Sequence, residues 1–433
     1  MFKKIITALL CTALVVSTAG CGGNDNSKSA SAKSQDGGDG AEEKTLELWT
    51  CWTVGAVTEQ EGKKQIEAFE KNTGIKVNQT NFTYDMLHEK ILTAAAGGNV
   101  PDLIWGLPEY VGEFYNMGIV ADMTEYYESW EDKSALTESV MDAMTIDGKI
   151  IGVPYEMTVR AYLTHEDDFK AANVSAPATW DELLTMTDYK TSTGKYPTEL
   201  ACTGVRSAQE LIVYLAQYDL EIAAAQKDGK YKNTWNENAD ELEKATKVFQ
   251  FYIDMVDKGV VDPNAKNWGW EETDEYFATG LVSSYVSGNW LAEREESNEA
   301  MADVGVKAIP YPADGKQATY MECKPLFIME ASQNKDEAFQ LAAAFCSKEW
   351  QSAAFADRSP RSDVTTDSKW SKDFQALADG GVTFPPVTLS GVTQAMQDAL
   401  AKVLQEGKTA EEAAAWLSDA VNSSLKDSGE LSE

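Results

Sequence analysis

The sequence predicts an α/β fold in which helices cover a mostly parallel sheet. Strand-like and helix-like patterns alternate from residue 46 to residue 105, a βαβαβ rhythm typical of parallel sheets with helices on both faces. The chain has 433 residues and 43% hydrophobic content, which is ample for a core and usual for two or three domains.

The N-terminal residues resemble a secretory signal. Lys3 and Lys4 precede an apolar run over residues 5–16 and small residues at 17–20. The run is far shorter than the ~20 residues of a membrane-spanning helix, and no later segment is long and apolar enough. We therefore expect residues 1–20 to be a removable signal peptide.

Cys21 follows directly, and with residues 17–20 it resembles the lipobox of bacterial lipoproteins. The resemblance implies cleavage before Cys21 and acylation of its thiol, which would hold the protein at a bilayer surface. The alternative is an ordinary signal peptide followed by an incidental cysteine. Residues 22–40 are mostly Gly, Ser, Asn, Asp, Ala, Lys and Gln, so we expect residues 21–43 to form a flexible tether.

The first predicted strand and helix are indicated by local sequence patterns. Residues 46–52 are apolar and β-prone, which predicts a strand. Residues 59–71 place Ile66 and Phe69 on one helical face, and Gly74 stands where a left-handed cap is wanted. A second strand is predicted from residue 75.

A second helix and a third strand continue the rhythm. Apolar residues over 86–92 predict a helix that ends at Gly97 and Gly98, and Pro101-Asp102 leads into a strand at 103–105. Further on, Asp147-Gly148 predicts a hairpin turn.

Residues 179–182 match a capping box at a helix start. In that box Thr179 and Glu182 satisfy free amides of the first turn. Trp180, between them, is interpreted as structural.

The formal net charge of −33 makes nucleic acid an improbable partner. It would also repel an anionic ligand at long range unless a local basic pocket overrides it, so a neutral ligand fits more easily. Cys51, Cys202, Cys323 and Cys346 are not spaced like a zinc site, and no disulfide pair is predicted. No metal or cofactor is expected.

Several motifs occur in one order along the chain, at residues 69–77, 96–102, 147–155, 177–183, 277–280 and 288–290. They resemble the maltose-binding-protein-like family (family 1) of extracellular solute-binding proteins that serve ABC importers. Ile151 replaces a usual tyrosine, and Tyr110 stands where the maltose type has a basic residue. Residues 383–396 also lack tryptophan, so maltose itself is not the expected ligand.

The resemblance implies a two-lobed periplasmic-binding-protein-like fold with a hinge. One lobe would comprise 44–155 and 311–358, and the other 156–310 and 359–433. It implies capture of a carbohydrate by lobe closure and delivery to an ABC import permease. We expect an oligosaccharide, because several tryptophans could stack successive sugar rings. The protein would be a lipid-anchored monomer on the extracellular face of the bacterial cytoplasmic membrane.

A sugar needs aromatic plates for its C–H faces and charged or amide groups for its hydroxyls. The aromatic candidates are Trp52, Trp105, Trp268, Trp270 and Trp290, for each of which core packing is the alternative. The polar candidates are Asp85 and Glu109, both placed in loops after strands, with Tyr110, Glu156, Arg160, Arg206, Tyr320, Glu322, Arg358 and Arg361. The alternative for the charged ones is a solvated surface or a weak ion pair.

Two rival functions stay open. A secreted glycosidase could use Glu109 and Glu156 as paired carboxylates. Against it, the chain has only two histidines and no Gly-x-Ser-x-Gly elbow, phosphate loop or His-Glu-x-x-His helix. The other rival keeps the fold and binds a polyol, a sugar phosphate or a peptide.

Overall fold

The computed structural model describes residues 44–295, 297–368 and 370–433, without the side chains of residues 84, 85, 138, 139 and 293. The predicted signal peptide, Cys21 and the tether lie outside these residues. Within them, no helix has the length and apolar character needed to cross a bilayer.

The predicted βαβαβ unit is confirmed. It consists of β1 (Thr45–Thr50), α1 (Val57–Thr73), β2 (Lys76–Asn81), α2 (Tyr84–Gly97) and β3 (Leu103–Trp105). Strand β1 pairs in parallel with both β2 and β3. Helix α1 buries Ile66 and Phe69 and ends at Gly74, whose φ of 76° is left-handed as predicted.

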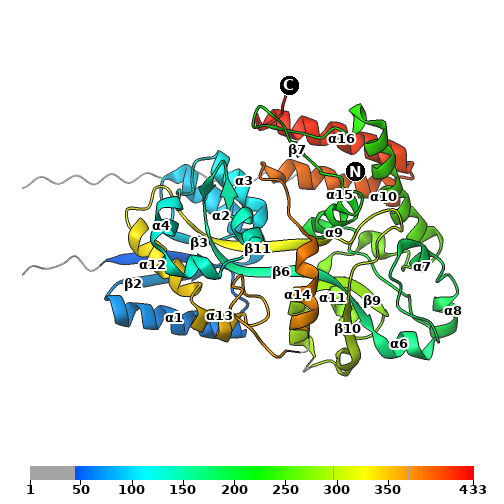
Figure 1. The fold of residues 1–433 in the computed structure, drawn as a ribbon, viewed down its shortest axis with the longest axis horizontal. Helices are drawn as coiled ribbons and strands as arrows, with labels where there is room; N and C mark the ends of the chain where they lie inside the picture. The colour runs from blue at the N-terminus through cyan, green and yellow to red at the C-terminus, as the bar shows by residue number, and fades with distance from the viewer. Residues whose placement is uncertain (1–43, 296, 369) are drawn as a thin grey trace, which may run out of the picture. The chain divides into compact units, whose positions relative to one another are not determined.

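Two long strands cross the fold, β6 (Val153–His165) and β11 (Thr319–Ile328). They pair antiparallel with each other, and β11 also pairs antiparallel with β3. The central sheet has the order β10-β6-β11-β3-β1-β2, with β9 added on β6 and β12 on β11. Figure 1 shows both strands running from the group of α1, α2, α3 and α12 to the group of α9, α11 and β9.

Separate hydrophobic cores lie along these strands. One core contains Leu46, Leu103, Tyr155 and Phe327, so it includes the first half of β6 and the end of β11. Another contains Tyr162 and Tyr320 with side chains of α9, α10, α15 and α16. The two strands thus contribute side chains to both of these cores.

The other elements in the first half of the chain are α3 (Pro108–Asn116), α4 (Thr124–Ser129), α5 (Glu138–Ala143), β4 (Thr145–Ile146), β5 (Lys149–Ile150), α6 (Glu166–Ala171), α7 (Trp180–Leu184), α8 (Tyr189–Thr193) and α9 (Gly204–Ala216). The predicted hairpin is confirmed, since β4 and β5 pair through Asp147 and Gly148, which have φ of 51° and 75°. The capping box at Thr179 and Glu182 is present. Trp180 is structural as interpreted, because its ring stacks on Phe251 at 4.1 Å.

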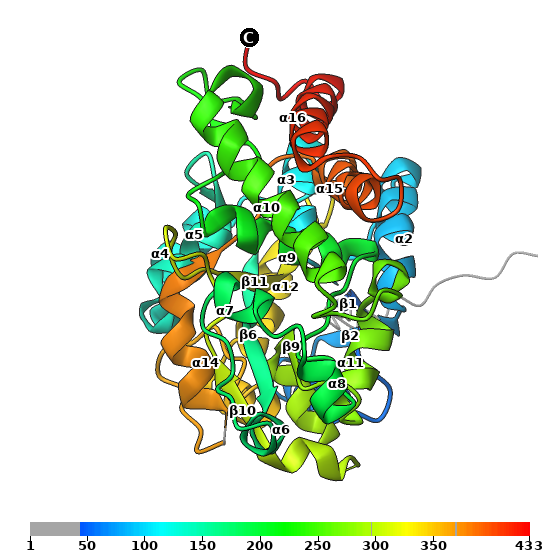
Figure 2. The same ribbon diagram turned by 90° about the vertical axis from the view of Figure 1, so that its right-hand side faces the viewer.

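The second half contains β7 (Ala224–Ala225), β8 (Tyr231–Lys232), α10 (Ala239–Asp257), α11 (Trp270–Ala278), β9 (Ser284–Gly288), β10 (Val304–Lys307), α12 (Lys335–Phe345), α13 (Lys348–Ala354), α14 (Ser371–Leu377), β12 (Gly381–Val382), α15 (Leu389–Leu404) and α16 (Ala410–Asp427). Helices α10, α15 and α16 pack beside one another, as Figure 2 shows. Helix α15 also touches α3, and a Cβ on Gly112 of α3 would lie 2.4 Å from the Val387 carbonyl oxygen. Glycine is needed there for this close approach.

Candidate functional site

A pocket of about 330 Å³ lies where α3 meets the starts of α9 and α15. Elements from both of the cores described above therefore contribute to one cavity. Its lining residues are His88, Leu107, Glu109, Tyr110, Glu113, Val205, Leu389, Ser390 and Thr393.

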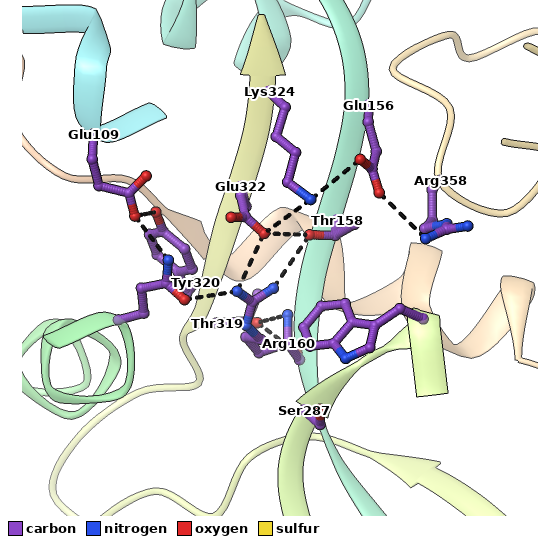
Figure 3. A network of polar contacts seen from close by, with 12 residues as sticks. Glu109, Glu156, Thr158, Arg160, Ser287, Thr319, Tyr320, Glu322, Lys324 and Arg358 are labelled. Atoms are coloured by element: carbon purple, nitrogen blue, oxygen red, sulfur yellow. Dashed lines mark hydrogen bonds and ion pairs between the residues drawn. The ribbon is translucent and has the colours of Figure 1, made fainter. Parts of the chain in front are cut away.

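Glu109 connects this pocket to a buried polar network (Figure 3). It lies in the first turn of α3 behind Pro108, and not in a loop as the sequence predicts, because proline favours the first helical position. Its Oε1 accepts hydrogen bonds from Gln209 at 2.8 Å and from the Tyr320 hydroxyl at 3.1 Å. Burial, aided by the charge of Glu322, raises the pKa of the Glu109 carboxyl.

Arg160 is the centre of the network. Its Nη2 donates to Gln209 at 2.9 Å and to Glu322 at 3.2 Å, and its Nη1 donates to Thr158 at 3.2 Å. The guanidinium carbon lies 4.5 Å from the centroid of the Trp290 ring. This geometry fixes a buried cation against an indole face.

A chain of ion pairs continues along the paired strands. Lys324 on β11 lies 3.2 Å from Glu156 on β6 and 3.7 Å from Glu322, and Arg358 lies 3.4 Å from Glu156. Burial alone would raise the pKa of Glu322, but Lys324 and Arg160 outweigh it and lower that pKa to about 2. Glu322 is therefore ionised at neutral pH.

Trp290 follows β9 and is held by Asp274 of α11. The indole Nε1 donates to Asp274 Oδ2 at 3.0 Å, and the other carboxylate oxygen accepts from Ser287 at 3.2 Å. A Cβ on Gly288 would lie 1.8 Å from the indole, so only glycine admits the ring in this position. Arg206 also lies over this ring, 4.8 Å from its centroid.

Most of the predicted ligand residues thus come together. Those in the network or the pocket are Glu109, Tyr110, Glu156, Arg160, Arg206, Trp290, Tyr320, Glu322 and Arg358. Tyr110 lines the pocket and stacks on His88 at 4.6 Å.

Two of the predicted indoles are buried in the first core instead. Trp52 is 6% exposed, and its Nε1 donates to the Tyr155 hydroxyl at 2.9 Å. Its ring faces Gly62, where a Cβ would lie 2.5 Å away. Trp105 is 5% exposed within the same core. Both therefore pack as core residues.

Three further candidates lie at helix starts, Trp268 and Trp270 just before and at the start of α11, and Asp85 on α2. Trp268 packs its ring on Tyr276 at 4.8 Å, whereas Trp270 is 46% exposed at the start of α11. Asp85 is in the first turn of α2 and not in the preceding loop, and its side chain is outside the described residues.

Arg361 has hydrogen-bond partners that do not belong to the network. It donates to Asp132 at 2.7 Å, to Asp363 at 2.9 Å and to the Cys346 carbonyl at 2.9 Å. These partners give it a structural role in tying the chain after α13 to the first core.

Sequence reasoning missed Gln209, Thr158, Lys324 and Asp274. A signal existed for two of them, because Thr158 and Lys324 are two residues from Arg160 and Glu322 on strands and so share their faces. Gln209 is three residues after Arg206 on α9, which places both on one side of the helix. No local signal marks Asp274.

Within residues 44–295, 297–368 and 370–433 the histidines, cysteines and carboxylates form no cluster that could hold a metal ion. No disulfide joins Cys51, Cys202, Cys323 or Cys346 in that part of the chain.

Two buried carboxyls behind the network predict a pH effect. Burial raises the pKa of Glu210 to about 8 and, with Asp262 and Glu210 nearby, that of Glu199 to about 9, from 4.5. The folded state then binds protons more tightly than the unfolded chain, so the free energy of unfolding should fall as the pH rises from about 5 to about 9. Glu210→Gln should flatten this fall in urea titrations across that range.

The control for this prediction is Glu411→Gln on the exposed face of α16. It should leave the pH dependence of unfolding unchanged. If Glu210→Gln and Glu411→Gln give the same pH profile, Glu210 is not a buried neutral carboxyl.

Comparisons with known proteins give a consistent match. A family model described as bacterial extracellular solute-binding protein matches residues 64–380. The galactooligosaccharide-binding protein of Bacillus subtilis (strain 168) is 23% identical over 348 residues, covering 79% of this chain and 76% of its own. The diacetylchitobiose binding protein DasA of Streptomyces coelicolor is 23% identical over 342 residues, covering 78% of this chain and 76% of its own.

A solved structure shows the same fold. The GacH receptor of Streptomyces glaucescens, determined without ligand and with acarbose, superposes with a TM-score of 0.76 at 20% identity, covering 89% of this chain and 99% of that one.

Proposed function

The chain belongs to the bacterial extracellular solute-binding proteins, and from this premise we propose that it captures a carbohydrate, an oligosaccharide, and delivers it to an ABC import permease. The named relatives bind galactooligosaccharide and diacetylchitobiose, and the similar receptor structure contains acarbose. These ligands share hydroxyl-rich rings, which supports the same class of ligand here.

One observation carries the proposal: buried polar atoms of the network, two of them on guanidiniums that lie over the Trp290 ring, have no protein partners among the described residues. Glu109 Oε2, Arg160 Nε and Arg206 Nη1 have no hydrogen-bond partner among the described residues. Such atoms are costly to leave unsatisfied and are a sign of a bound group. A carboxylate accepts hydrogen bonds and a guanidinium donates them. The hydroxyl groups of a sugar can both donate and accept, so they can bond to both kinds of group.

Closure of two lobes would complete these contacts. We propose lobes of 44–155 with 311–358 and of 156–310 with 359–433, hinged on β6, β11 and the chain near Arg358. The ligand would bind both lobes only in the closed form, and that difference in affinity drives closure. Residues 1–20 would be removed, lipid on Cys21 would anchor the monomer outside the cell, and residues 22–43 would tether it.

Binding without catalysis fits the network better than a glycosidase does. Glu156, the second carboxylate of that alternative, is paired with Lys324 and Arg358 and so is poorly placed to attack a sugar or activate water. Incubation with oligosaccharides should therefore release no reducing ends.

The direct test is a thermal-shift screen over a glycan panel. A ligand that binds only the native state should stabilise it by about 2.7 kcal/mol at a hundredfold excess over Kd, which raises the melting temperature. Calorimetry on the hits should give one ligand per chain. Shifts with peptides or polyols and with no glycan would contradict the carbohydrate proposal.

A further inference from the structure

Arg206 differs from every other arginine in the part of the chain that the structure describes. Among the described side chains, no carboxylate oxygen lies within 4.0 Å of its guanidinium. Each of the others is ion-paired: Arg160 with Glu322, Arg294 with Glu275, Arg358 with Glu156 and Arg361 with Asp132.

This unpaired cation is also buried. Arg206 is 7% exposed, and its Nη1 has no acceptor among the described residues. The Trp290 ring, 4.8 Å away, offsets only part of the lost hydration of a guanidinium. A buried charge is most stable with a counter-ion in direct contact, and among the described residues Arg206 has none.

The acidic side chains around Arg206 are already engaged or uncharged. Asp274 accepts from Trp290 and Ser287, and Glu322 is shared by Arg160 and Lys324.

Glu210 is one helical turn further along α9, and burial raises its pKa to about 8. It is therefore mostly protonated at neutral pH. Tyr285 bonds to Thr273, and burial raises its pKa well above the usual value. Burial lowers the pKa of Arg206, but the neighbouring Tyr285, Asp274, Glu210 and Glu322 outweigh it and raise that pKa. Among the described residues, however, none of these carboxyls forms an ion pair with the guanidinium.

The position of Arg206 adds to the attraction for an anion. It lies in the first turn of α9, whose N-cap Thr203 makes no side-chain cap. The neighbouring Val205 lines the same pocket as Glu109. Free amides and the helix dipole favour negative charge at this end, beside a guanidinium that needs it.

We propose that the bound carbohydrate carries a carboxylate, as a uronic acid unit does, and that Arg206 binds this carboxylate. The inference rests on the proposed function and narrows its ligand class. One planar guanidinium suits a planar carboxylate, which it can bind through two parallel hydrogen bonds. A phosphate dianion would need more cations, and Lys324 and Arg358 are already in ion pairs.

The test compares matched sugars by calorimetry on the purified protein. The pairs differ only at C6: galacturonate with galactose, glucuronate with glucose, and the corresponding 1,4-linked disaccharides, with glucose 6-phosphate added. The uronate of the preferred pair should bind about ten- to a hundredfold more tightly than its neutral partner. Its affinity should fall with added salt, whereas that of the neutral sugar should not.

Arg206→Gln should reduce the ratio of the two affinities to about one, and Arg206→Lys should keep part of it. Arg294→Gln, at an exposed ion pair, is the matched control and should keep the full preference. If the Arg206 variants unfold, the salt dependence of uronate binding to the unmodified protein still tests whether the site recognises a negative charge.

Tighter binding of the neutral sugar, or of the phosphate, would overturn the inference and leave carbohydrate binding intact. Binding of no sugar, either in these pairs or in the glycan panel of the thermal-shift screen, would instead overturn the proposed function.

Discussion

Replacing Glu322 with alanine is expected to lower the free energy of unfolding by about 3–5 kcal/mol at pH 7. The substitution leaves Arg160 and Lys324 buried without the carboxylate that lies 3.2 Å and 3.7 Å from them. Removing one partner of a buried ion pair leaves the other charge buried, without a counter-ion and without hydration. Urea unfolding monitored by circular dichroism measures the loss.

Glu275→Ala supplies the matched control, because Glu275 pairs with Arg294 at 2.7 Å with its side chain 60% exposed. Solvent screens such a pair, so the loss there should stay within about 1 kcal/mol. Equal losses at the two sites would show that the Glu322 network does not stabilise the fold.

The pH dependence gives a second check on Glu322. Its pKa is lowered from 4.5 to about 2 in the folded protein. The stabilisation from its charge is therefore fully present above about pH 4.5 and is lost as the pH falls towards 2. The difference in unfolding free energy between the unmodified protein and Glu322→Ala should shrink over that interval.

The first three strands could be predicted because their signals are local. Gly74 caps α1 in the conformation that its sequence position indicates, and Asp147-Gly148 turns the hairpin with two positive φ angles. Each signal depends on a few adjacent residues.

The site depends on contacts that no local signal encodes. The basic residues of the site are far apart in the sequence. They are Arg160, Arg206, Lys324 and Arg358, from four separate stretches of chain. They become neighbours only when β6 pairs with β11 and α9 packs against β11. The side-chain order along β6 could have pointed to Thr158, but Asp274 needs the folded structure to be found.

The burial of the indoles also required the structure. Trp52 and Trp105 follow or end strands, where ligands of α/β sheets gather, and on that ground both are candidates. In the structure Trp52 fills the space that Gly62 leaves, and Trp105 packs in the same core. A tryptophan at a strand end can face either way, and only packing decides which.

Trp290→Ala is expected to weaken carbohydrate binding by about a hundredfold or more, because central aromatic residues that orient charged groups contribute about 2–4 kcal/mol. The indole lies beside the guanidiniums of Arg160 and Arg206, at 4.5 Å and 4.8 Å, and its loss frees both. Trp290→Phe keeps a ring face but loses the hydrogen bond to Asp274. Its affinity for the carbohydrate should therefore lie between those of the unmodified protein and Trp290→Ala. Calorimetry with the glycan found in the screen measures each variant.

Trp416→Ala separates this effect from the general loss of an indole. Trp416 also lies under a cation, with Lys402 at 4.2 Å, but on α16 and outside the network. It should leave affinity unchanged. Trp290 is only part-buried, so Trp290→Ala should keep a cooperative thermal transition while binding is lost. Unchanged affinity in Trp290→Ala would mean that the ligand does not bind beside this ring, and that the unpartnered atoms of Glu109, Arg160 and Arg206 serve some other group.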